Sequence, residues 1–86
     1  MADLTVTVVS ADEQIWAGQA TMVVARTKEG EIGILAGHQP LLGILAAGEV
    51  RITAADGGRI TAQAEDGFIS VENDTVTIAA RAASLA

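Results

Sequence analysis

The chain of 86 residues has no cysteine, one histidine, one proline and two aromatic side chains. Without cysteine, neither a disulfide framework nor a thiolate metal site can form. With His38 as the only histidine, the sequence also lacks the ligand set of a zinc site and the partner groups that a catalytic histidine needs. The sequence therefore predicts no catalytic, metal-binding or cofactor-binding residue, and no cofactor is expected.

Basic residues are scarce, since five Lys and Arg stand against eleven Asp and Glu, for a formal net charge of −6. Such a chain repels a phosphate backbone, so nucleic acid is excluded as a partner. No run approaches the roughly 20 apolar residues of a membrane-spanning helix, and residues 1–3 lack the basic character of a signal peptide. We expect a cytoplasmic protein.

Short apolar runs are abundant, because half of the residues are hydrophobic and nine glycines divide them. Residues 4–9 alternate apolar side chains with threonine, which is the pattern of a β-strand, and similar alternation recurs further along the chain. Turn signals such as Asp66-Gly67 separate these runs. The fold class is predicted to be all-β, a small β-sandwich or flattened barrel of about ten short strands.

A single domain is expected over residues 1–86, because no linker, repeat or low-complexity tract interrupts the chain. Residues 80–86 have a helix-forming composition, but they are too few for a stable helix in water. We therefore expect a frayed tail over 80–86.

The most distinctive segment is EGEIGILAGHQPLL, residues 29–42. Its first glycine permits a turn at an acidic tip, between Glu29 and Glu31. Its last glycine and its proline bracket His38 in a shaped loop. A turn, a short strand and a loop are predicted here.

Glu-Gly, Ile-Gly-Ile and Gly-His-x-Pro-Leu-Leu, in this order and spacing, resemble the signature of the epsilon subunit of F-type ATP synthases. Residues 15–18 and 67–71 resemble two further elements of that family, so the similarity covers the whole chain. It implies the N-terminal β-sandwich domain of the family. The C-terminal helical hairpin, which carries ATP binding and inhibition in many relatives, has no counterpart in these residues, so neither activity is carried over.

The resemblance implies a non-catalytic rotor subunit of the central stalk, which clamps the gamma subunit to the c ring and supports coupling and assembly. The complex would also contain alpha, beta and delta subunits, and would lie peripherally at the cytoplasmic face of a bacterial cell membrane. In the family, the counterparts of Ser10, His38 and Gly43 face gamma. The acidic tip, Glu29 and Glu31, would contact the polar loops of the c ring.

Other interpretations of these residues remain open. His38 could be a plain loop histidine, and the two glutamates a solvated turn. Phe68 is expected in the core, whereas Trp16 fits the core and an interface equally well. A different class, the lipoyl- or biotinyl-type carrier domain, is also small, acidic and β-rich, and would present Lys28, the sole lysine, at a hairpin tip. A small enzyme would need a convergent set of reactive groups, which the sequence lacks.

Overall fold

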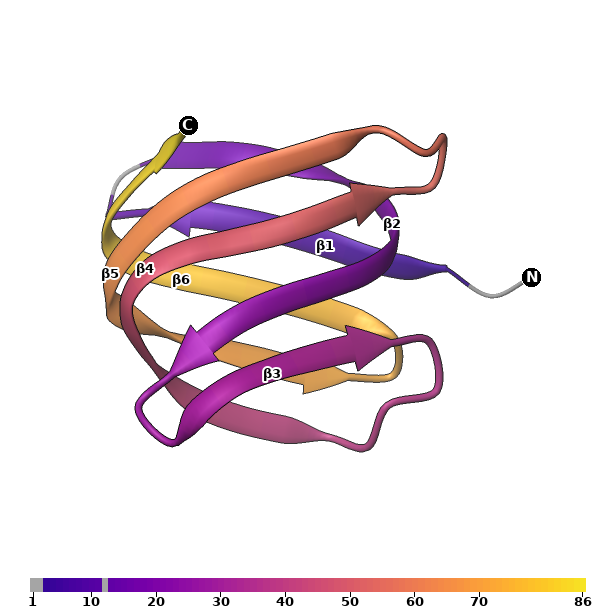
Figure 1. Ribbon diagram of the computed structural model, residues 1–86, viewed down its shortest axis with the longest axis horizontal. Helices are drawn as coiled ribbons and strands as arrows, with labels where there is room; N and C mark the ends of the chain where they lie inside the picture. Colours follow the sequence, from indigo (N-terminus) through magenta and orange to yellow (C-terminus); the bar gives the residue numbers. More distant parts are fainter. Residues whose placement is uncertain (1–2, 12) are drawn as a thin grey trace.

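The computed structural model describes residues 3–11 and 13–86, and these residues form six β-strands and no helix (Figure 1). The strands are β1 (Leu4–Ser10), β2 (Glu13–Thr27), β3 (Gly30–Leu35), β4 (Leu41–Ala54), β5 (Arg59–Glu72) and β6 (Thr75–Leu85). No helix long and apolar enough to cross a membrane is found among the described residues. The prediction of an all-β fold is confirmed.

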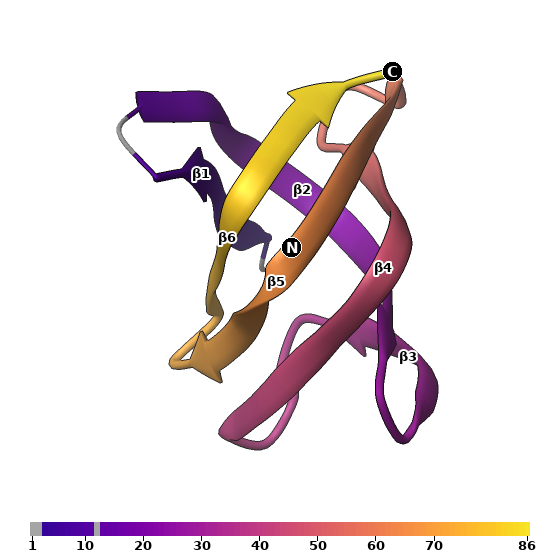
Figure 2. The same ribbon diagram turned by 90° about the vertical axis from the view of Figure 1, so that its left-hand side faces the viewer.

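Five strands close into a barrel in the order β1, β6, β5, β4, β2 and back to β1, while β3 pairs with β2 outside this ring. β1 and β6 run parallel, and the other neighbours run antiparallel. The molecule measures 32 × 24 × 19 Å, so the barrel is flattened. Its long strands curve from one broad face to the other (Figure 1, Figure 2).

The core is formed by the inward-facing side chains of all six described strands. In β1, Leu4, Val6 and Val8 are fully buried, as the period-two pattern predicts. The remaining buried hydrophobic residues are Ala20, Val23, Ala25, Ile34, Leu45, Val50, Ile52, Ala62, Ala64, Ile69, Val71, Val76, Ile78 and Ala80. Aromatic rings are absent from this set, so the core depends on small aliphatic side chains that interlock closely.

The count of about ten short strands is wrong, because several predicted turns are bends inside long strands. Asp66 and Gly67 were expected to separate two strands, yet β5 runs through both. Asp66 has a positive φ of 57°, which bends the chain without reversing it, and the register with β6 skips this residue. The register between β4 and β5 is likewise interrupted between Ile44 and Gly48. Long strands of 11 to 15 residues thus replace pairs of short ones.

Residues 80–85 belong to β6, and the expectation of a frayed tail is wrong for them. This segment pairs with β5 as far as the register partners Ala62 and Leu85. Its composition favours a helix, but pairing with β5 satisfies the backbone groups and buries Ala80. Arg81 donates a 2.7 Å hydrogen bond to Asp66, and this bond and the carboxylate charge raise the pKa of Arg81.

A side chain at Gly67 is expected to disrupt the fold. A Cβ there would overlap the backbone of Ala79 and Ala80 in β6, so Gly67→Ala forces β5 and β6 apart. We expect the free energy of unfolding, measured by urea denaturation, to fall by at least about 3 kcal/mol. Gly33→Ala is the matched control, because nothing lies within 4 Å of its Cβ position, and its effect should stay below about 1 kcal/mol. Equal stability of the two variants would contradict the packing of β5 on β6.

Candidate functional site

One broad face of the barrel carries an exposed apolar patch, defined as Leu42, Ile44 and Phe68. Their exposed fractions are 71%, 57% and 42%. Ile44 in β4 is the register partner of Phe68 in β5, and Leu42 lies two residues along β4, on the same side of the strand. Three large apolar side chains gathered in contact with water indicate an interaction surface.

The expectation that Phe68 packs in the core is wrong, because the inward position of β5 is taken by Ile69, which is fully buried. Sequence reasoning also missed Leu42 and Ile44. Apolar residues occupy four of the five positions in the run 41–45, so alternation alone does not show which side is outward. The pairing of β4 with β5 shows which side is outward, since residues opposite each other in a ladder share a face.

The face continues from the patch across β6 to β1. Phe68 pairs with Ala79 in β6, and Ala79 pairs with Val9 in β1. Since neighbouring strands are about 4.8 Å apart, the row from Ile44 to Val9 is roughly 14 Å wide. Ser10 follows Val9, and it therefore lies across this face from β4.

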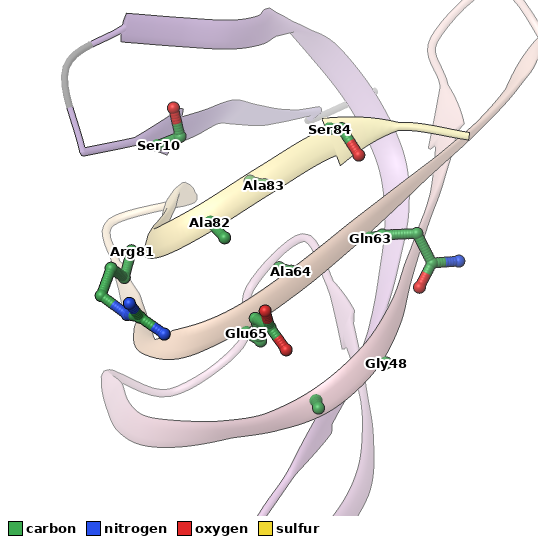
Figure 3. Close-up of a pocket in the computed structure, with 10 residues that line it drawn as sticks. Ser10, Gly48, Gln63, Ala64, Glu65, Arg81, Ala82, Ala83 and Ser84 are labelled. Carbon is green, nitrogen blue, oxygen red and sulfur yellow. The ribbon is translucent and has the colours of Figure 1, made fainter.

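Ser10 also lines a groove of about 530 Å³ beside the last part of β6 (Figure 3). Small residues, among them Gly48 and Ala83, form much of the lining, together with the charged side chains of Glu65 and Arg81. Arg81 is engaged by Asp66 in an ion pair at 2.7 Å. The labelled polar side chains point in different directions in Figure 3, so they do not converge on one point as a small-molecule site requires.

His38 lies half-buried in the loop 36–40, between β3 and β4. Its N–H donates to the carbonyl oxygen of Leu35 at 3.1 Å. Its ring Nδ1 lies 2.6 Å from the carbonyl oxygen of Gln39. Because a carbonyl can only accept, this contact assigns the proton to Nδ1 and leaves Nε2 as the ring nitrogen available to a partner.

Gly43 differs from Ser10 and His38 because it is buried. An added Cβ would lie 3.4 Å from methyl groups of Ile69 and Thr27, so this position faces the inside of the barrel. The contact predicted for Gly43 stays a prediction. The exposed side chains at this point of the surface are those of the residues on either side of it, which belong to the apolar patch.

Glu29 and Glu31 lie at the β2–β3 hairpin, which is at the opposite end of β2 from the β1–β2 hairpin (Figure 2). The Thr27 hydroxyl shapes this turn, since it donates to the Gly30 carbonyl at 2.8 Å and accepts the Glu29 N–H at 3.2 Å. Glu31 forms an ion pair with Arg51 at 3.1 Å, and both side chains are 54% exposed. Within the part of the chain that the structure describes, Glu29 forms no ion pair, so its charge faces solvent.

Lys28 and Glu29 form the two-residue turn of this hairpin, because Thr27 and Gly30 are register partners. The sole lysine therefore lies at a hairpin tip, where the carrier hypothesis requires it. Across residues 3–11 and 13–86, no group of three or more His, Cys, Asp or Glu is arranged to hold a metal ion.

A flattened β-barrel with an apolar patch on one face and an acidic hairpin tip has the surface features that are typical of a docking domain, a class of domain that contacts other proteins. Comparison with known proteins gives its family. The family described as "ATP synthase, Delta/Epsilon chain, beta-sandwich domain" matches residues 3–86, and the chain belongs to this family. The resemblance drawn from the sequence signature is thereby confirmed.

Relatives named ATP synthase epsilon chain match along the whole chain. The protein of Micrococcus luteus is 54% identical, and the match covers 99% of this chain and 93% of that one. The protein of Rhodococcus jostii is 52% identical, with 100% and 71% covered. Since the epsilon chain is a structural and regulatory subunit of ATP synthase, the prediction of a non-catalytic subunit is confirmed.

Solved structures agree with this assignment. A chain in the Euglena gracilis mitochondrial ATP synthase, solved with OSCP, F1 and the c ring, superposes with a TM-score of 0.91 at 29% identity. The present chain is covered over 99% of its length and spans about half of that one, 54%. A central-stalk and c-ring structure from Tetrahymena thermophila matches with a TM-score of 0.73 at 17% identity, which shows the fold alone.

Removal of the Thr27 hydroxyl is expected to loosen the acidic tip. Thr27→Val keeps the shape of the buried side chain but loses both hydrogen bonds to the turn. The free energy of unfolding should fall by about 1 kcal/mol, measured by chemical denaturation. Thr21→Val, in the same strand, is the control, because its hydroxyl makes only a long contact of 3.4 Å with the Thr53 carbonyl. Equal effects of the two variants would mean that the Thr27 hydroxyl does not stabilise the turn.

Proposed function

We propose that the chain is a rotor subunit of the ATP synthase central stalk, docking to the gamma subunit through the apolar patch and to the c ring through the acidic tip. It would clamp gamma to the ring and support coupling and assembly, in a complex that also contains alpha, beta and delta subunits. Its location would be the cytoplasmic face of a bacterial cell membrane, peripheral and held there by the complex. The observation that carries the proposal is the apolar patch, which begins in β4 just after the loop with His38 and shares a row of register partners with Val9, next to Ser10.

The patch and its surroundings fit a protein partner in size. The accessible surface is 4947 Å², and a standard interface takes about 800 Å² from each partner, so one contact uses roughly a sixth of it. Leu42, Ile44 and Phe68 would form the apolar centre of such an interface. Ser10, at one margin, and the Nε2 atom of His38, at the other, would contribute polar contacts at the rim.

The acidic tip fits a different kind of contact. Glu29 and Glu31 are exposed, and an exposed ion pair contributes only roughly 0 to 1 kcal/mol. Their charge would therefore guide the encounter with basic or polar loops of the ring and set its orientation, rather than supply most of the affinity. Glu31 already has Arg51 as a partner, so Glu29 offers the carboxylate that a second protein would engage first.

The two proposed contacts are joined directly through the backbone. The Lys28 N–H donates a 2.9 Å hydrogen bond to the Ile44 carbonyl, and Thr27 is the register partner of Leu45. The hairpin tip is thus bonded to the strand that carries the patch. A displacement at the tip reaches the gamma-facing surface without passing through a flexible loop, which suits a subunit that transmits rotation.

Leu42→Ser is expected to weaken gamma binding without unfolding the chain, because Leu42 is 71% exposed. The dissociation constant for the gamma subunit, measured by calorimetry, should rise about tenfold to a hundredfold, as for loss of a buried leucine side chain at an interface centre. Leu85→Ser at the end of β6 is the matched control, with 50% exposure away from the patch. Equal affinities of both variants would show that gamma does not cover the patch.

Glu29→Lys is expected to weaken attachment to the c ring. The reversal replaces the tip carboxylate by an ammonium, so the amount of chain retained on gamma-depleted membrane sector should fall, most clearly at low salt. Glu13→Lys changes the net charge equally at the other end of β2 and should leave retention unchanged. Loss of retention in both variants would indicate a general charge effect, and loss in neither would remove the tip from the proposed contact.

A further inference from the structure

One side chain fastens the loop 36–40 to the rest of the barrel. The Gly37 N–H donates a 2.7 Å hydrogen bond to Oδ1 of Asp74, a residue 37 positions further along the chain. The other hydrogen bonds found for this loop are local, from the His38 N–H to Leu35 and from the His38 ring to Gln39. An ionised acceptor makes a stronger hydrogen bond than a neutral one. Asp74 is therefore the main constraint on the loop that leads into the apolar patch.

Asp74 has a backbone conformation that glycine would adopt with less strain. Asn73 and Asp74 are the central residues of the turn between β5 and β6, and their φ angles are 50° and 59°. In such turns glycine is favoured at the second position, because a Cβ is disfavoured at positive φ. The Asp74 carbonyl accepts the Thr5 N–H at 2.8 Å, but any residue could supply that carbonyl. The carboxylate is thus the feature that distinguishes aspartate from glycine here.

The same contact ties the loop to the sheet that carries the patch. Asp74 lies between β5 and β6, and its carbonyl is bonded to the start of β1. These three strands carry most of the face that runs from Phe68 to Ser10. Through the carboxylate, the loop with His38 keeps a fixed position relative to that face.

We infer that Asp74 is a positioning residue for docking, whose carboxylate holds Gly37 and His38 in the arrangement that the gamma subunit meets. The inference rests on the proposed function, because it concerns the same face. A loop that is ordered before binding loses less conformational entropy on association, so the contact strengthens binding although Asp74 need not touch the partner.

Two variants of the turn separate positioning from stability. Asp74→Gly relaxes the strained backbone and removes the carboxylate, whereas Asn73→Gly relaxes the neighbouring residue and keeps the carboxylate. Asn73→Gly should fold with at least the wild-type stability, and in Asp74→Gly the relief of backbone strain should offset the lost hydrogen bond. In Asp74→Gly, hydrogen exchange of the Gly37 amide, followed by NMR, should quicken about tenfold, and the affinity for the gamma subunit should fall about fivefold. Asn73→Gly should match the wild type in both, and Asp74→Asn, which keeps an oxygen acceptor, should recover most of the protection.

Faster exchange together with weaker affinity in Asp74→Gly alone supports the inference. Unchanged exchange at Gly37 overturns it, because the hydrogen bond then does not hold the loop. If the wild type binds gamma and Asp74→Gly binds it equally well, the inference is overturned while the proposed function stands. Absence of gamma binding by the wild-type chain overturns the proposed function, and the docking role of Asp74 with it.

Discussion

Thr27 joins three strands of this small barrel, β2, β3 and β4. It ends β2, and it is the register partner of Gly30 in β3 and of Leu45 in β4. Its methyl group lies against the position where Gly43 has no side chain, and its hydroxyl organises the acidic turn. At 7% exposure it is the buried polar residue of the described core, and its hydroxyl is hydrogen-bonded, as burial requires. One side chain thus couples the closure of the ring, the packing beneath the apolar patch and the shape of the tip.

This arrangement explains how the described residues, which form no helix and no aromatic core, present two surfaces at a fixed distance from each other. The patch depends on the alternation of β4, which turns Leu42 and Ile44 outward when Gly43 and Leu45 turn inward. The tip depends on the two-residue turn of the β2–β3 hairpin. Because the apolar patch and the acidic tip both lie next to Thr27, the distance between them is set by strand geometry rather than by a linker. The proposed role between two partners requires such a fixed separation.

Local pattern predicted the fold class and the turn at the acidic tip, since period-two alternation and a glycine beside charged residues act over a few residues. It failed at Asp66 and along residues 80–85, where the outcome depends on a partner strand. A positive φ at Asp66 can reverse a chain or merely bend it, and only the ladder with β6 decides which. The alanine-rich end of β6 is a strand because β5 supplies its hydrogen bonds, which overrides helix propensity.

Some residues of the candidate site could likewise be predicted from the sequence, and others could not. Ser10, His38, Glu29 and Glu31 came from the family resemblance, which is read along the chain, and the structure puts all four at least partly in contact with solvent. Phe68, Ile44 and the hydrogen bond between Gly37 and Asp74 depend on residues 24 or more positions apart, so no window of sequence contains them.

The parallel pairing of β1 with β6 governs how the domain responds to force. Because the two strands run in the same direction, pulling the start of β1 and the end of β6 apart slides one strand along the other. The five register pairs from Thr5 with Thr75 to Val9 with Ala79 then bear the load together. An antiparallel pair pulled at one end would instead break its hydrogen bonds one after another. In the proposed rotor, this pairing would let the domain resist shear with all five register pairs of the β1–β6 ladder at once.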